Sequence, residues 1–134
     1  MSKYILGIDQ GTTGSKAIVF DEGANISSTA YSEFTQYFPQ PGWVEHDAQE
    51  IYDVTMAMVK KCIDDGGLDP RDLVTIGITN QRETTVFWDK RTGKPLCPSI
   101  VWQDCRTADR CMERSWRSSG MRSTPARAAC PSPT

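Results

Sequence analysis

The segment that most constrains the fold is residues 4–20, where two short apolar runs flank a turn that contains glycine. The first run holds Tyr4, Leu6 and Ile8, and the second holds Val19 and Phe20. Short apolar runs joined by a glycine-bearing turn are typical of a β-hairpin. We therefore predict strands at residues 3–9 and 15–21 with a tight turn between them.

The turn carries the residue types that hold a phosphate group. Its string is Asp9-Gln10-Gly11-Thr12-Thr13-Gly14-Ser15-Lys16. The two glycines permit backbone conformations that direct amide N–H groups at an anion. The threonines add hydroxyl donors, Lys16 can reach back to a phosphate, and Asp9 can hold Mg²⁺ through water.

This turn has to be distinguished from a P-loop and from an ordinary hairpin turn. A P-loop requires GxxxxGK[ST] followed by a helix, whereas a strand follows here. An ordinary hairpin turn also favours Gly and Thr, so the turn alone does not decide between the two interpretations. The complete D-x-G-T-T-x-S-K pattern favours phosphate binding.

The remaining pattern predicts an α/β chain with the order β-β-β-α-β-β-β-α. A third strand at residues 26–34 would complete an antiparallel meander. After a loop at residues 35–46, Asp47 and Glu50 form a capping-box-like start to a helix with a 3.6-residue apolar stripe, which ends at Gly66-Gly67. Further strands are predicted at residues 73–79, 84–88 and 99–102, and Asp104 is predicted to cap a second helix through Met112.

The end of the sequence differs from the rest. After Val101 there is no Leu, Ile, Val or Phe, and from residue 105 onward six Arg face only two acidic residues. Such a segment cannot bury enough apolar surface to offset its chain entropy. We therefore predict one partial domain over residues 1–110 and an atypical tail over 111–134, interpreted either as disordered or as the product of a frameshift.

Composition excludes several classes of protein. The chain of 134 residues has a formal net charge of −2, one histidine and five cysteines with no CxxC pair. We expect no zinc site, no nucleic-acid partner, no secretory signal and no membrane span, and therefore a cytoplasmic location with free thiols.

The hairpin resembles the first phosphate-binding loop of the actin, Hsp70 and sugar-kinase superfamily. Three later segments resemble the glycerol kinases of the FGGY carbohydrate kinase family. They are PGWVEHD at residues 41–47, IGITNQRETT at residues 76–85, and IVWQD at residues 100–104. The resemblance runs from about residue 4 to about residue 110.

The resemblance implies a ribonuclease-H-like amino-terminal lobe, here incomplete, and transfer of the γ-phosphate of ATP to glycerol. The nucleotide positions are Asp9, Gln10, Gly11, Thr12, Thr13, Gly14 and Lys16, with Asp9 also at the Mg²⁺ position. The substrate positions are Thr12, Arg82, Glu83 and Trp102. Arg donates to hydroxyl oxygens and Glu accepts from hydroxyl hydrogens, which suits a small polyol. Lys16 stands where many relatives have Arg, so the planar guanidinium that could contact a phosphate with two hydrogen bonds is replaced by a compact ammonium group.

The family's general base is an Asp from a later part of its chain, so we assign no catalytic residue here and expect this chain alone to be inactive. The alternatives are another FGGY sugar kinase or a non-functional truncated product. Without the resemblance, Arg82 and Glu83 would be interpreted as a solvated pair and Trp102 as core. His46 and Trp43 are predicted to be structural, and the sequence predicts no oligomeric state.

Overall fold

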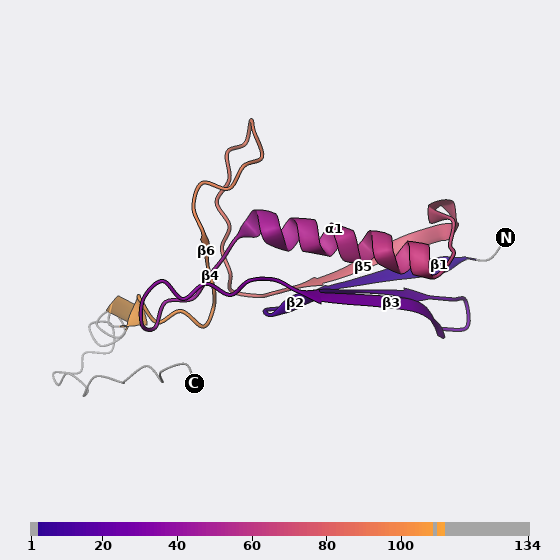
Figure 1. Cartoon of the computed structure of the whole chain (residues 1–134), viewed down its shortest axis with the longest axis horizontal. Helices are drawn as coiled ribbons and strands as arrows, with labels where there is room; N and C mark the ends of the chain where they lie inside the picture. Colours follow the sequence, from indigo (N-terminus) through magenta and orange to yellow (C-terminus); the bar gives the residue numbers. More distant parts are fainter. Residues whose placement is uncertain (1–2, 109, 112–134) are drawn as a thin grey trace.

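A computed structural model describes residues 3–108 and 110–111 of the chain (Figure 1). Its main body is a four-stranded sheet with one long helix on one face, and a smaller two-stranded sheet lies at one end. The elements in chain order are β1 (Tyr4–Gln10), β2 (Gly14–Phe20), β3 (Ile26–Glu33), β4 (Glu45–His46), α1 (Ala48–Asp65), the 3₁₀ helix η1 (Pro70–Asp72), β5 (Leu73–Asn80) and β6 (Ser99–Ile100).

The large sheet has the order β3-β2-β1-β5. Strand β2 pairs antiparallel with both β1 and β3, which confirms the predicted meander. Strand β5 then pairs parallel with β1, so that Gln10 lies opposite Asn80. Because β1 and β5 are parallel, their carboxyl ends lie at the same edge of the sheet.

Helix α1 begins as the sequence predicts but uses its capping residues differently. Asp47 is the N-cap, and its carboxylate accepts from the amides of Gln49 and Glu50. The expected return bond of a capping box is replaced, because the Glu50 carboxylate accepts from the amide and hydroxyl of Thr35 and from the Tyr37 hydroxyl. Glu50 therefore fastens the preceding loop to the helix.

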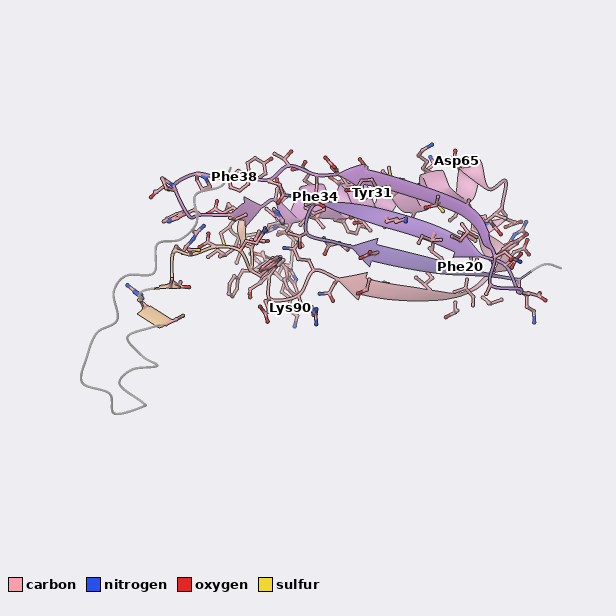
Figure 2. The ribbon with its side chains drawn as sticks, turned by 90° about the horizontal axis from the view of Figure 1, so that it is seen from below. Phe20, Tyr31, Phe34, Phe38, Asp65 and Lys90 are labelled. Atoms are coloured by element: carbon pink, nitrogen blue, oxygen red, sulfur yellow. The ribbon has the colours of Figure 1, made fainter. Side chains whose placement is uncertain are left out.

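The core lies between α1 and the antiparallel strands. Its buried members are Leu6, Ala17, Val19, Ala30 and Cys62. Two hydroxyl contacts add to this interface: Ser15 and Thr55 lie 2.7 Å apart, and the Ser28 hydroxyl donates to the Cys62 carbonyl at 2.7 Å. Figure 2 views the sheet from the opposite, open face, on which Phe20 and Tyr31 lie.

Strand β5 is much less covered than the other three strands. Val74, Ile76 and Ile78 are 57%, 55% and 70% exposed. Ile76 pairs with Leu6 and Ile78 with Ile8, so these side chains continue the helix-covered face beyond the edge of α1. An apolar strip of the sheet is therefore open in the described part of the chain.

The second half departs from the sequence prediction in two places. Residues 84–88 were predicted as a strand but form only two isolated bridges, Thr85 with Ile100 and Trp88 with Pro95. Residues 35–46 were predicted as a loop, yet Glu45 and His46 form β4 and pair antiparallel with β6. The second difference arises from pairing between segments far apart in sequence, which local patterns do not report.

The predicted second helix is seen only at its start, where the Cys111 amide donates to the Thr107 carbonyl. The remainder of that helix and of the predicted tail lies outside the described residues. Within the described residues, no helix is long and apolar enough to cross a membrane.

Candidate functional site

The predicted site residues gather at the edge of the sheet where β1 and β5 end. The hairpin turn, Gly11 to Thr13, follows β1, and Arg82 and Glu83 follow β5. The carboxyl ends of parallel strands are where open α/β sheets place their ligands. The parallel pairing of two strands separated by more than 60 residues thus creates the site.

The hairpin turn is closed by its own backbone and packed against β3. The Gly11 amide donates to the Gly14 carbonyl at 2.9 Å. A Cβ atom on Gly14 would lie 2.5 Å from the Ser32 carbonyl oxygen and 2.9 Å or less from the Tyr31 ring. Neither glycine adopts a positive φ, so the turn does not use the left-handed conformations that glycine permits. Close approach to β3 is the reason for glycine at position 14.

Asp9 and Lys16 lie directly opposite each other on β1 and β2. Both are exposed, on the sheet face away from α1. Opposite residues of an antiparallel pair have Cβ atoms roughly 5 Å apart. An acidic and a basic residue therefore lie next to each other beside the turn.

Arg82 and Glu83 stand exposed at the end of β5, and the residue before them is anchored. The Gln81 amide donates to Oε1 of Gln10 at 3.3 Å, which ties this segment to β1 just before the hairpin turn. Glu83 has φ +57°, in the left-handed region that non-glycine residues seldom adopt. Such conformations persist where the surroundings enforce them, and they cluster at functional sites.

Trp102 joins the two halves of the predicted site. Its indole N–H donates to the Thr12 hydroxyl at 3.1 Å, across 90 residues of sequence. Trp102 is also 54% exposed, so the alternative interpretation as a core residue was wrong. One predicted substrate residue is therefore in direct contact with the predicted nucleotide loop.

Behind these residues lies a buried polar group whose members are far apart in the sequence. His46 is fully buried, with Phe34 packed edge-on against its ring. Its Nε2 lies 2.6 Å from Oε1 of Gln36, and its Nδ1 lies 3.5 Å from Nε2 of Gln81. Burial lowers the pKa of His46, although the Gln81 contact and the Glu50 carboxylate oppose that shift. No local pattern in the sequence points to this contact set.

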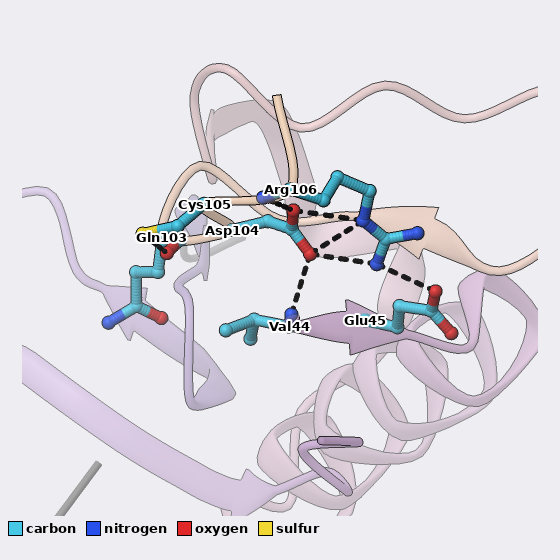
Figure 3. A network of polar contacts seen from close by, with 6 residues as sticks. All are labelled: Val44, Glu45, Gln103, Asp104, Cys105 and Arg106. Carbon is cyan, nitrogen blue, oxygen red and sulfur yellow. Dashed lines mark hydrogen bonds and ion pairs between the residues drawn. The ribbon is translucent and has the colours of Figure 1, made fainter. Parts of the chain in front are cut away.

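A second polar group holds β4 against the segment after β6 (Figure 3). The Arg106 guanidinium pairs with Glu45 and Asp104, each at 2.7 Å, and Asp104 also accepts from the Val44 amide at 2.7 Å. Burial opposes ionisation of Asp104, but the hydrogen bonds from Arg106 and Val44 outweigh it and lower the pKa of that carboxyl. Arg106 also lies 3.7 Å from the centre of the Trp43 ring, so Trp43 packs as predicted.

A cavity of about 900 Å³ is lined on one side by Glu45, His46 and Asp47. Its walls include Tyr37, Phe38, Leu96 and Pro98, and none of the predicted site residues lines it. The predicted site is instead open at the sheet edge, because Arg82, Glu83 and Trp102 are all exposed.

The class of protein is defined by the sheet order, the helix that covers one face, and the sheet edge where the predicted site residues gather. This is the ribonuclease-H-like α/β fold of the actin, Hsp70 and sugar-kinase superfamily, as the solved structures it resembles show. A glycerol kinase from Plasmodium falciparum, solved with ADP, aligns with a TM-score of 0.76 at 37% identity, covering 85% of this chain and 23% of that one. A xylulose kinase from Rhodospirillum rubrum aligns with a TM-score of 0.75 at 27% identity, covering 86% and 23%.

The chain belongs to the FGGY family of carbohydrate kinases, whose N-terminal domain matches residues 4–125. Glycerol kinase 2 of Thermotoga maritima is 56% identical over 111 residues, which are 83% of this chain and 22% of that protein. A glycerol kinase of Solidesulfovibrio magneticus is 55% identical over 113 residues, 84% of this chain and 23% of that protein. The chain therefore spans less than a quarter of the length of these relatives.

Proposed function

We propose that this chain supplies the phosphate loop and the polyol-binding strand end of an ATP-dependent glycerol kinase, which transfers the γ-phosphate of ATP to glycerol and forms glycerol 3-phosphate. The observation that carries the proposal is the bond from the Trp102 indole to the Thr12 hydroxyl, which joins the two predicted binding regions. The named glycerol kinases at 55–56% identity support the choice of substrate.

On the nucleotide side, the turn from Gly11 to Gly14 faces the phosphates with amide and hydroxyl donors. Lys16 adds a positive charge, which electrostatically stabilises a transferring phosphoryl group. Asp9 is the proposed carboxylate for Mg²⁺, an ion that keeps several waters and usually takes only one or two carboxylates beside phosphates. The single exposed carboxylate of Asp9 fits that role. Bound Mg²⁺ would neutralise phosphate charge.

On the substrate side, Arg82 and Glu83 would hold the glycerol hydroxyls by donating and accepting hydrogen bonds. The exposed Trp102 ring would pack on the carbon backbone of glycerol. We assign no general base among the described residues. A cytoplasmic location, where ATP and glycerol are both present, belongs to the same proposal.

A different FGGY sugar substrate is the second candidate. It is favoured by the xylulose kinase, which aligns almost as well in space as the solved glycerol kinase. The fold is common to both, so only the side chains at the strand end can discriminate between the substrates. Binding of a panel of polyols and ketoses separates the two candidates.

The proposal is tested by ligand binding to the 134-residue chain, followed through its amide and indole nitrogen resonances. We expect glycerol to shift the Trp102 indole signal and MgADP to shift the amide signals of Thr12 to Gly14. An Arg82→Met variant should lose the glycerol response, whereas Arg71→Met, far from the site, should keep it. A chain that responds to neither ligand would contradict the proposal, and a stronger response to xylulose would favour the second candidate.

Asp9 is tested in an active setting by grafting residues 4–108 onto the matching part of Thermotoga maritima glycerol kinase 2. We expect the hybrid to phosphorylate glycerol and Asp9→Asn to lower its kcat, on the order of a hundredfold, as for other groups that stabilise developing charge. Asp21→Asn, in the far turn of the sheet, is the control. Full activity of the Asp9→Asn hybrid would remove Asp9 from the metal site.

A further inference from the structure

An unbroken series of side-chain hydrogen bonds runs beneath the candidate site from one binding region to the other. Gln36 Nε2 donates to the Thr12 carbonyl at 3.1 Å, and Gln36 Oε1 lies 2.6 Å from His46 Nε2. On the other side of the ring, Gln81 Nε2 lies 3.5 Å from His46 Nδ1 and 2.6 Å from the Thr84 hydroxyl. We call Gln36, His46 and Gln81 the amide–imidazole bridge.

The chemistry of the three side chains fixes the direction of every bond. An amide oxygen can only accept, so His46 Nε2 must carry the proton and donate to Gln36. The bare Nδ1 then accepts from the Gln81 amide nitrogen, whose second hydrogen goes to Thr84. A neutral imidazole in the Nε2–H form therefore donates to Gln36 and accepts from Gln81, which agrees with its full burial. Oε1 of Gln81 is also buried and has no hydrogen-bond partner among the described residues.

Each end of the bridge contacts one of the two regions that form the candidate site. At one end, the Thr12 carbonyl belongs to the hairpin turn, whose amides and hydroxyls face the phosphates. At the other end, Gln81 directly precedes Arg82 and Glu83, and its own amide is bonded to Gln10. Glu83 holds a backbone conformation that needs enforcement from its surroundings.

We propose that the amide–imidazole bridge makes His46 a positioning residue, which sets the hairpin turn and the Arg82–Glu83 segment relative to each other. A buried histidine that merely fills space would need no partner at either binding region. Here each ring nitrogen is bonded to a residue that leads to a different region. What the two regions bind rests on the function proposed above, whereas the bridge itself does not.

If the bridge couples the two regions, a substitution at one end should change the amide resonances at the other end. Gln36→Leu removes the bonds to Thr12 and to His46 from a half-buried position. We expect it to shift the amide resonances of Thr12 to Gly14 and also those of Gln81 to Glu83, which Gln36 does not touch. Gln49→Leu, the same substitution on the surface of α1, should move neither set. Shifts confined to the surroundings of Gln36 would overturn the proposal.

A second variant changes the Gln81 end of the bridge, and it provides the test if Gln36→Leu fails to fold. Thr84→Val preserves shape and removes the hydroxyl that anchors Gln81. We expect it to shift the ring nitrogens of His46 and the amides of Thr12 to Gly14, whereas the neighbouring Thr85→Val should not. The unaltered chain gives a third measurement, because nitrogen NMR must show His46 with the proton on Nε2. The Nδ1–H form would contradict the bridge.

The outcome separates this proposal from the proposed function. If neither glycerol nor MgADP shifts any resonance of the unaltered chain, the proposed function fails, but the two-ended response to Gln36→Leu still supports the bridge. If the ligands bind and the two-ended response is missing, the bridge fails and the proposed function stands.

Discussion

At the scale of single residues, contact with a neighbouring strand and burial matter more than residue type. Gly14 is needed because β3 passes too close for a side chain, and burial lowers the pKa of His46, which lies between two amides. Glu83 shows the reverse case, since a residue with a full side chain holds a conformation that suits glycine. Two predictions belong to this scale.

Gly14→Ala should destabilise the chain by about 2 kcal/mol, the usual cost of overpacking against backbone that cannot yield easily. The new methyl group would meet the Ser32 carbonyl oxygen at 2.5 Å. Gly77→Ala is the matched control, because a Cβ atom there meets nothing within 4 Å. We expect the control to be neutral or slightly stabilising. Equal unfolding midpoints in urea for the two variants would disprove the steric argument.

Stability should fall as the pH drops below about 6.5, the ordinary pKa of histidine. Burial lowers the pKa of His46 in the folded state, so the unfolded chain binds more protons in this range. The stabilisation is complete above the unfolded pKa and is lost as the pH falls from there through the folded pKa. Urea unfolding between pH 8 and pH 5 measures the slope, and His46→Phe should abolish it. Because the chain has one histidine, a slope that survives this substitution would assign the effect to another group.

At the scale of elements, polar contacts from outside each element decide where it docks. Glu50 of α1 holds the loop at Thr35, and Arg106 holds β4 against the segment that follows β6. These contacts replace local ones that the sequence alone would favour, such as the return bond of the capping box. The contacts of Arg106 are the better test of this statement, because the chain also contains a similar Arg–Asp pair that is exposed to solvent.

Arg106→Met should destabilise the chain by about 2 kcal/mol, the order expected when a buried carboxylate loses a charged partner. The Asp104 side chain is only 2% exposed and that of Arg106 17%. Arg71 pairs in the same way with Asp69, two positions earlier in the chain, but the Arg71 side chain is 89% exposed. Exposed pairs of this kind contribute little, so Arg71→Met should leave the unfolding curve unchanged. Equal effects would show that burial does not strengthen the Arg106 pair.

At the scale of the whole molecule, the fold leaves the apolar strip on β5 open. An exposed edge strand with apolar side chains invites pairing with other chains. We expect the chain to self-associate as its concentration rises, and Ile78→Lys to reduce this, as measured by light scattering. Ile26→Lys, at an exposed position on the first residue of β3, is the control. Association that is unaffected by Ile78→Lys would place the contact elsewhere.

Local patterns were sufficient for the parts of the molecule whose pairing is local. The hairpin, the meander and the start of α1 were predictable, because adjacent strands joined by tight turns pair with each other and an Asp N-cap acts within one turn. The strand predicted at residues 84–88 was wrong, because this segment forms only isolated bridges. Strand β4 was missed, because its partner β6 lies far away in the chain. A two-residue strand has too few residues to leave a periodic signal.

By itself, the sequence determined the hairpin turn with its phosphate-binding residue types, the identity of the Arg82–Glu83 pair and the family they indicate. Only the tertiary structure decided that Trp102 reaches Thr12 and that His46 lies between Gln36 and Gln81. The physical reason is that residue type sets what a side chain can donate or accept, whereas strand pairing and burial decide which distant group it meets.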